Sequence, residues 1–144
     1  MNHLNSGNLI YGLNVIKALA RQDTFAVTVK TQNKTVHYGD AYFAATTNHP
    51  YFGGGFVILP KANIFSHELD TIIVEKPSLS KFIFLFTKLL KNGSHVNAPQ
   101  FHYVEAQEIH IETKKPKFAQ IDGEDIEAQK YQINFRIDHF NLLK

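Results

Sequence analysis

The stretch FAVTVKTQNKTVHYGDAYFAATT, residues 25–47, decides the fold that we predict for this chain. Apolar residues alternate with polar or small ones over residues 25–30, and a second run rich in β-branched and aromatic residues extends from Thr35 to Thr47. Alternation with a period of two is typical of strands with one buried face. The two runs therefore predict a β-hairpin, with a bulge or break at Gly39-Asp40 in its second arm.

Strand-like runs recur along the rest of the chain, at residues 56–59, 69–75, 101–104, 104–111, 118–121 and 131–137. Helical spacing occurs twice, at Leu9–Ala20 and at Leu79–Lys91, where Ser78 is the predicted N-cap and Asn92-Gly93 ends the helix. Two helices are too few for repeated βαβ units. The predicted fold is therefore mainly β: an antiparallel β-sandwich or flattened barrel with two peripheral α-helices.

Composition limits the class of protein. The 144 residues predict one domain, 1–144, and 44% hydrophobic with 19% charged residues is typical of a globular protein. A formal charge of +2 is too small to favour nucleic acid as a partner. Cysteine is absent, which excludes disulfides and a thiolate nucleophile. Without a signal peptide or a long apolar run, we predict a cytoplasmic protein that at most contacts the inner face of a membrane.

Familiar motifs of catalysis are mostly missing. Gly53-Gly54-Gly55 is not followed by the lysine and helix of a P-loop, so it predicts only a close backbone approach beside some ligand. The eight histidines lack the spacing of a zinc site, and Ser66-His67 lacks the glycines of a nucleophile elbow.

Asp122 and Glu124, in the segment Ile121-Asp122-Gly123-Glu124-Asp125, have two interpretations. The runs 118–121 and 131–137 are the predicted arms of a hairpin around this segment, and an Asp-Gly pair between two strands is the usual sequence of a tight turn, whose carboxylates are simply solvated. In a plain extended strand the two carboxylates would share a face and could perform acid–base chemistry. The local sequence leaves both interpretations open.

Three stretches in order resemble the C-terminal domain of the bacterial diacylglycerol kinase and sphingosine kinase superfamily of lipid kinases. These are Asn48–Phe56 with Leu59-Pro60-Lys61-Ala62, then Leu69–Val74, and then Ile121–Glu124. The helix ending at Gly93-Ser94-His95 and the strand Val104–Ile111 also occupy the places that this family gives them. The resemblance covers nearly the whole chain.

The resemblance implies transfer of the γ-phosphoryl group of ATP to the hydroxyl of diacylglycerol or a related lipid. It implies that Glu124, with Asp122 close by, takes the proton from the attacking hydroxyl, and that Asn48, Gly53, Gly54 and Gly55 line the substrate cleft. Mg²⁺ would accompany ATP.

The family's nucleotide-binding domain has no counterpart in these residues. We therefore expect a sandwich domain that is incomplete at its N-terminus, that receives ATP through another domain and that is inactive alone. A non-catalytic lipid-binding or regulatory module is the alternative, and unpaired sheet edges would permit a homodimer.

A structural Mg²⁺ site is a weaker implication of the same resemblance. Many bacterial members hold this ion with an aspartate shortly before the strand that begins at Leu69. Ser66-His67 stands at that place here, which leaves Asn63, Ser66 and Glu68 as weak candidate ligands. Asp70 is predicted to have an ordinary role in or beside the strand.

Overall fold

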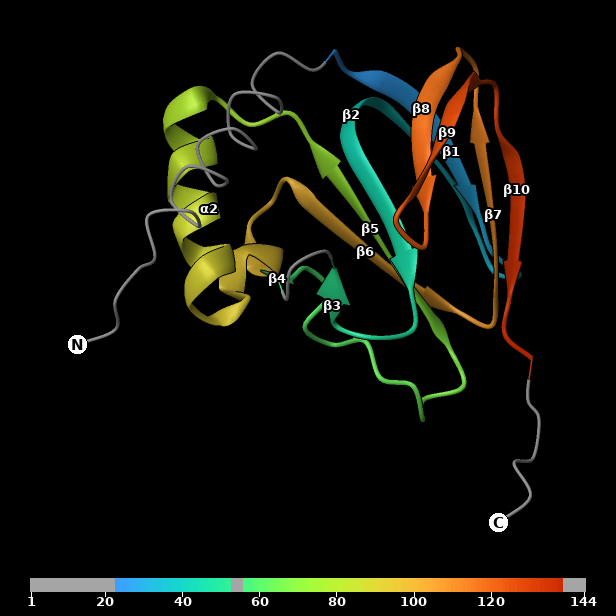
Figure 1. Cartoon of the computed structure of the whole chain (residues 1–144), viewed down its shortest axis with the longest axis horizontal. Helices are drawn as coiled ribbons and strands as arrows, with labels where there is room; N and C mark the ends of the chain where they lie inside the picture. Colours follow the sequence, from blue (N-terminus) through green and yellow to red (C-terminus); the bar gives the residue numbers. More distant parts are fainter. Residues whose placement is uncertain (1–22, 53–55, 139–144) are drawn as a thin grey trace.

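The computed structural model describes residues 23–52 and 56–138. Within them the chain forms ten strands, one α-helix and one 3₁₀-helix (Figure 1). In order these are β1 (Phe25–Lys30), β2 (Thr35–Thr47), β3 (Tyr51–Phe52), β4 (Phe56–Val57), β5 (Leu69–Glu75), α2 (Leu79–Asn92), η1 (Ser94–Asn97), β6 (Phe101–Ala106), β7 (Glu108–Thr113), β8 (Lys117–Ile121), β9 (Glu124–Gln129) and β10 (Gln132–Arg136). The predicted helix Leu9–Ala20 lies outside the described residues.

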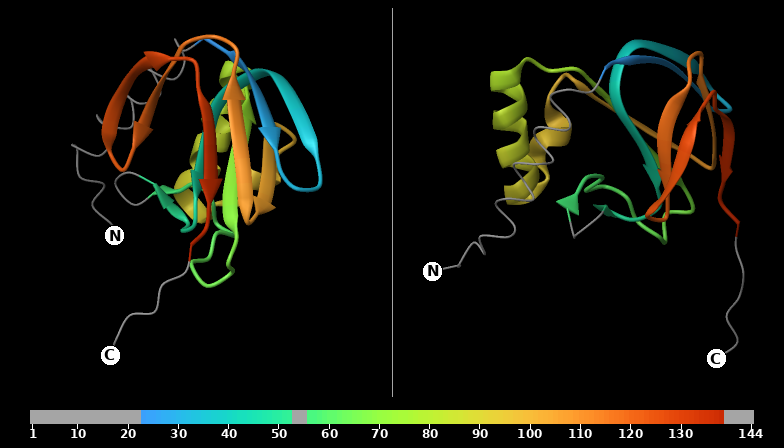
Figure 2. Two further views of the ribbon diagram at one scale, coloured as in Figure 1. Left: turned by 90° about the vertical axis from the view of Figure 1, so that its right-hand side faces the viewer. Right: turned by 45° about the horizontal axis from the view of Figure 1, so that its top comes forward.

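Six strands form one antiparallel sheet in the order β10-β7-β1-β2-β5-β6. Only Gln107 separates β6, at one edge, from β7, next to the other edge. One residue cannot cross a flat sheet of this width. The sheet must therefore fold back on itself, and Figures 1 and 2 show β6 and β7 in opposing layers. This geometry confirms the predicted mainly β fold, with an antiparallel sheet curled into a flattened barrel.

The main core fills the space inside the curled sheet. It consists of buried side chains from five strands: Val27, Val29, Tyr38, Ala41, Ile73, Val104, Ala106 and Ile109. A second cluster on the other face of β5 joins Ile72 and Val74 to Leu59 and Ala62 of the segment after β4. Strand β5 is therefore buried on both faces, as its nearly unbroken apolar sequence requires.

The hairpin of residues 25–47 forms as predicted. Phe25 pairs with Ala41 and Val27 pairs with Tyr38. Between these pairs, β2 has two residues, Gly39 and Asp40, where β1 has only Ala26. This is the predicted bulge. The bulge increases the local twist of β2, which helps the sheet to curl where β2 pairs with β1 on one side and β5 on the other.

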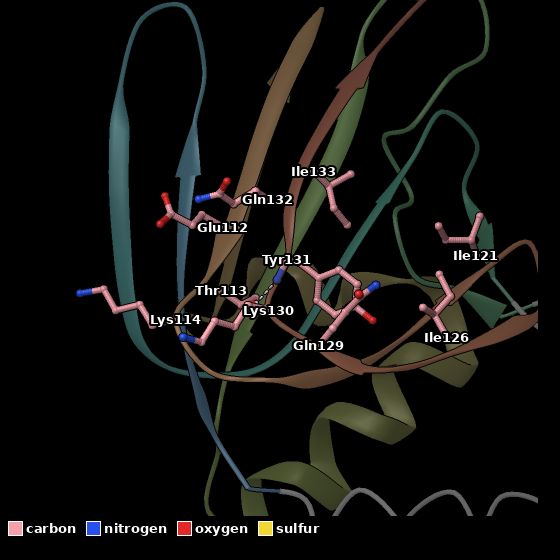
Figure 3. Close-up of a pocket in the computed structure, with 10 residues that line it drawn as sticks. All are labelled: Glu112, Thr113, Lys114, Ile121, Ile126, Gln129, Lys130, Tyr131, Gln132 and Ile133. Carbon is pink, nitrogen blue, oxygen red and sulfur yellow. Dashed lines mark hydrogen bonds between the residues drawn. The ribbon is translucent and has the colours of Figure 1, made fainter.

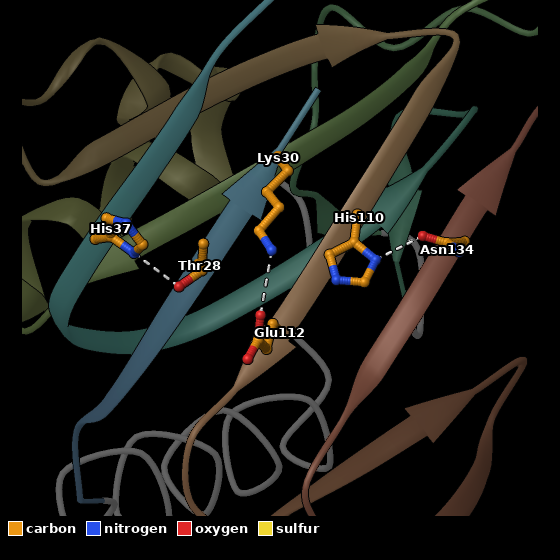
Figure 4. A network of polar contacts seen from close by, with 6 residues as sticks. All are labelled: Thr28, Lys30, His37, His110, Glu112 and Asn134. Atoms are coloured by element: carbon orange, nitrogen blue, oxygen red, sulfur yellow. Dashed lines mark hydrogen bonds and ion pairs between the residues drawn. The ribbon is translucent and has the colours of Figure 1, made fainter. Parts of the chain in front are cut away.

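The outer face of this hairpin and its neighbours carries polar pairs across the strands (Figure 4). The Oγ1 atom of Thr28 lies 2.8 Å from Nδ1 of His37, and Nδ1 of His110 lies 2.6 Å from Oδ1 of Asn134. Lys30 forms a 3.4 Å ion pair with Glu112. These histidines thus form part of cross-strand pairs on the sheet surface.

Two predicted strand boundaries and one predicted strand pairing were wrong. Strand β4 ends at Val57 and not at residue 59, because the amide of Leu59 turns back to the carbonyl of Pro50 at 3.2 Å. The single run 104–111 is broken at Gln107, where the chain changes layers. The second arm of the Asp-Gly hairpin is β9, and residues 131–137 belong to another pairing.

Tyr131 explains why the last of these predictions failed. Its amide donates to Oγ1 of Thr113 at 2.9 Å, and its carbonyl accepts from the amide of Thr113 at 2.9 Å. The chain therefore leaves the hairpin after β9, and β10 pairs with β7 instead. Two alternating strands in succession cannot be assigned to partners from their periodicity alone.

Helix α2 begins at Leu79 as predicted and ends at Asn92, one residue beyond the predicted Lys91. Ser78 precedes it in an extended conformation, and Gly93 ends it with φ of 68°, in the left-handed region that favours glycine. Its buried side faces the sheet through Leu85 and through Phe82, whose ring meets that of Tyr42 edge-on at 6.2 Å between centroids.

Replacing Gly93 with alanine is expected to lower the free energy of unfolding by about 1–2 kcal/mol, because a left-handed residue gains a Cβ. That Cβ would also lie 3.1 Å from Cβ of Pro60. Gly39→Ala is the matched control, since no atom lies within 4 Å of the added methyl group. Urea denaturation measures both, and equal losses in the two variants would contradict this assignment.

Candidate functional site

The Asp-Gly segment forms a two-residue turn between β8 and β9. Ile121 pairs with Glu124 across the strands, and Asp122 and Gly123 have φ of 50° and 91°. Both central residues are left-handed, as in the turns that match the twist of a β-hairpin. The hairpin interpretation of the local sequence is thus confirmed, and the plain extended strand is excluded. Both carboxylates are exposed.

Glu124 occupies a defined face of this hairpin. Residues paired directly across two strands project to the same face, and so do residues two apart along one strand. Glu124 is paired with Ile121 and is two residues from Ile126. These three side chains therefore share one face, whereas Asp125, paired with Gln120, occupies the opposite face.

A cleft of about 830 Å³ lies on that face of the hairpin, between it and the edge of the large sheet (Figure 3). Its apolar lining comes from Ile121 and Ile126 on the hairpin and from Tyr131 and Ile133 at the start of β10. Lys114 and Lys130 add cationic groups to its wall. Glu124 is not among the lining residues, but it projects from the same hairpin face as Ile121 and Ile126, which line this partly apolar cleft.

The cleft was not predicted from the sequence. Its lining residues lie on segments whose strand pairing was predicted wrongly. Residues 131–137 were predicted to pair with residues 118–121, whereas β10 pairs with β7. The alternation over residues 131–137 was a usable signal, because it indicated apolar side chains on one face of a strand.

The other residues predicted to line the substrate cleft are Asn48, Gly53, Gly54 and Gly55. Asn48 is exposed in the bend that follows β2. Within the described residues, no hydrogen bond joins it to Asp122 or Glu124. Gly53, Gly54 and Gly55 lie outside the described residues. Their role beside a substrate stays a prediction.

The predicted metal ligands are engaged with one another in the loop before β5. Oδ1 of Asn63 accepts from the amide of Phe65 at 2.9 Å, and the hydroxyl of Ser66 donates to the carbonyl of Asn63 at 2.7 Å. Glu68 is the one carboxylate among these three candidates. Two neutral oxygen donors already used internally, with one carboxylate, do not fit a structural Mg²⁺ site.

Metal-ligating side chains are likewise scattered elsewhere. Across residues 23–52 and 56–138, no three histidine, aspartate or glutamate side chains are grouped so as to hold a metal ion.

Within residues 23–52 and 56–138, no helix is long and apolar enough to span a bilayer.

Asp70 is a buried carboxyl group within β5, as predicted for an ordinary role in the strand. Only 2% of it is exposed, and Oδ1 accepts a 2.6 Å hydrogen bond from the hydroxyl of Tyr103 on β6. Burial raises the pKa of Asp70, and the Tyr103 hydrogen bond opposes that rise. The same contact and burial raise the pKa of Tyr103.

His95 secures the segment that packs beneath α2. It is buried, and its Nε2 lies 3.0 Å from the carbonyl oxygen of Ile58. Burial lowers the pKa of His95, which keeps the ring neutral, with Nε2–H as the donor to this carbonyl. The Gly93-Ser94-His95 motif therefore has a structural role: it ends the helix and fixes the loop that carries Ile58.

Asp70→Asn is expected to remove a pH dependence of stability. Because the folded pKa is raised above the ordinary 3.8, the folded state binds this proton more tightly than the unfolded chain does. The stabilisation is complete below the ordinary pKa and is lost as the pH rises through the folded pKa. The difference in unfolding free energy between wild type and Asp70→Asn should therefore fall with rising pH, starting near pH 4.

Urea denaturation at a series of pH values measures this difference. Tyr103→Phe serves as a second variant, because losing the hydrogen bond that favours the charged carboxylate should make the decline steeper. Parallel curves for wild type and Asp70→Asn would contradict a raised pKa.

Comparison with known proteins assigns the fold to a class. The structure superposes on the crystal structure of a diacylglycerol kinase from Bacillus anthracis str. Sterne with a TM-score of 0.65 and 24% sequence identity, covering 87% of this chain and 43% of that one. A second crystal structure, of a putative diacylglycerol kinase from the same organism, superposes with a TM-score of 0.61 and 24% sequence identity. The match covers 94% of this chain and 46% of that one. The shared fold is the β-sandwich-like second domain of these proteins.

Sequence comparison identifies the family. Residues 1–141 match the model of the YegS C-terminal NAD kinase beta sandwich-like domain, and the chain belongs to this family. A Bacillus subtilis (strain 168) protein with the name "Putative lipid kinase YtlR" is 32% identical over 117 residues. That match covers 81% of this chain but 37% of the relative's length. The resemblance inferred from the motifs is thereby confirmed.

Proposed function

We propose that this chain is the lipid-binding half of an ATP-dependent lipid kinase that phosphorylates the hydroxyl of diacylglycerol or a related lipid. The observation that carries the proposal is the placement of Glu124 on the hairpin face that borders the cleft. The names of the Bacillus relatives support the same reaction class. ATP would be bound by a nucleotide-binding domain outside these residues, with Mg²⁺ neutralising its phosphates.

The reaction assigns a simple task to Glu124. Its carboxylate accepts the proton of the lipid hydroxyl as the hydroxyl oxygen forms a bond to the γ-phosphorus, and the bond from that phosphorus to the bridging oxygen breaks to release ADP. Phosphoryl transfer depends mainly on positioning and charge stabilisation, so one exposed carboxylate on a rigid hairpin suffices as the base. Asp122, within the same turn, would orient the acceptor.

The cleft would hold the apolar part of the acceptor. Ile121, Ile126 and Ile133 offer side chains without polar groups, and acyl chains bind to such surfaces through burial of apolar area. Because Ile121 directly precedes Asp122, an acyl chain in the cleft could place its attached hydroxyl group at the turn. Such a protein would work in the cytoplasm at the inner face of the membrane.

A non-catalytic lipid-binding module is the second candidate function. One observation favours it: helix α2 carries exposed apolar side chains at Leu79, Ile83 and Phe84, a surface of the kind that binds lipid or another protein. Binding of a fluorescent diacylglycerol without any phosphorylation in the presence of a nucleotide-binding domain would support this alternative.

The test of the leading proposal is a phosphorylation assay. The chain is combined with the nucleotide-binding domain of its full-length protein, Mg-ATP and dioleoylglycerol in mixed micelles, and phosphorylated lipid is quantified. We expect phosphatidic acid to accumulate. Binding of ATP by the assembled protein, with no phosphorylated product from diacylglycerol or other long-chain alcohols, would refute the proposal.

A further inference from the structure

Two neighbouring apolar side chains project from the loop that joins β4 to β5. Ile64 is 56% exposed and Phe65 is 78% exposed, although both are large enough to be buried in most folds. They follow one another at the tip of the loop, residues 61–68. An adjacent exposed pair of this kind indicates a surface that meets another apolar phase.

Three backbone amides of this loop are paired within the loop itself. The amides of Phe65 and Ser66 donate to Oδ1 and to the carbonyl of Asn63, each at 2.9 Å. The hydroxyl of Ser66 donates to that same carbonyl at 2.7 Å and accepts from the amide of Glu68 at 3.3 Å. A protein partner commonly pairs free backbone groups, whereas hydrocarbon offers none. Pairing of these three amides within the loop lowers the cost of bringing the loop to the lipid interface.

A cation stands at the base of this loop. Lys61 is exposed, and its Nζ atom lies 5.3 Å from the centroid of the Tyr103 ring, which holds the lysine at the base of the loop. Phosphate groups of anionic lipids complement such a charge, since the surface of an anionic membrane attracts nearby lysines by about 1 kcal/mol each.

We propose that Ile64 and Phe65 insert into the interfacial region of an anionic bilayer, with Lys61 at the lipid headgroups. The biological purpose of this contact rests on the proposed lipid-kinase function, but the contact itself does not.

Vesicle binding tests the proposal with a matched control. The chain is sedimented with vesicles of equal parts phosphatidylcholine and phosphatidylglycerol, and wild type is compared with Phe65→Ser and Phe118→Ser. Phe118, on β8, is 83% exposed, so both substitutions remove an exposed phenylalanine ring. We expect Phe65→Ser to bind roughly 10- to 100-fold more weakly, the effect of burying one phenylalanine, and Phe118→Ser to bind as wild type does.

Further variants separate the possible outcomes. Lys61→Gln should weaken binding to these vesicles but not to vesicles of phosphatidylcholine alone, and Glu124→Gln should bind normally even if no kinase activity is ever found. Equal binding by wild type and Phe65→Ser would overturn the proposal, as would equal losses for the two phenylalanine variants. If Phe65→Ser binds vesicles as wild type does but no longer associates with a nucleotide-binding domain, the loop belongs to a domain interface and the proposal is overturned.

Discussion

Glu124→Gln is expected to lower the rate of lipid phosphorylation by about 100- to 10,000-fold, the usual contribution of a general base. Glutamine preserves the size of the side chain and its position opposite Ile121 on the hairpin. It cannot accept the proton of the attacking hydroxyl. The measurement is the initial rate of phosphatidic acid formation by the assembled kinase at saturating ATP and diacylglycerol.

Asp125→Asn is the matched control for this prediction. Asp125 is an adjacent carboxylate on the opposite face of the hairpin, where it accepts a 3.1 Å hydrogen bond from Gln120. Its neutralisation should leave the rate within about threefold of wild type, because it faces away from the cleft. Equal losses of rate in Glu124→Gln and Asp125→Asn would mean that the loss comes from the change in net charge and not from removal of a general base. A larger loss in Asp122→Asn than in Glu124→Gln would transfer the role of the base to Asp122.

Ile73→Ala is expected to lower the free energy of unfolding by about 2–5 kcal/mol, the largest stability effect that we predict for a single side chain. Ile73 is fully buried in β5 and belongs to the core cluster inside the curled sheet. Its removal leaves a cavity where both layers meet, and surrounding strands that are hydrogen-bonded on each side can relax only partly. Urea denaturation measures the loss.

Ile64→Ala makes the same chemical change in the exposed loop and should alter stability by less than about 0.5 kcal/mol. A comparable loss at both positions would contradict the assignment of Ile73 to the core and of Ile64 to the surface.

Local sequence was sufficient for the elements whose signals are local. Alternation over residues 25–47 predicted the hairpin and its bulge, and Ser78 and Gly93 predicted both ends of α2, because capping and pleating act over a few neighbouring residues. The Asp-Gly pair likewise predicted its turn, since few residues other than glycine and aspartate accept left-handed backbone.

The candidate site could be predicted only in part. Motif order pointed to Asp122 and Glu124, but neither the motifs nor the periodicity indicated which segment faces them. The weak candidate ligands Asn63 and Ser66 illustrate the same limit, because their oxygens form hydrogen bonds within the loop that only its folded shape determines.

The amino-acid sequence alone determined the mainly β class of this protein, its hairpin turn and its family resemblance, because each depends on residues near one another or on their order. The tertiary structure alone decided that Gln107 turns the chain from one layer to the other and that β10 pairs with β7. It thereby decided that a cleft is lined by Ile121 and Ile126, on the hairpin face to which Glu124 also projects. The physical reason is that many strand pairings satisfy the same alternation, and burial of one shared core selects among them.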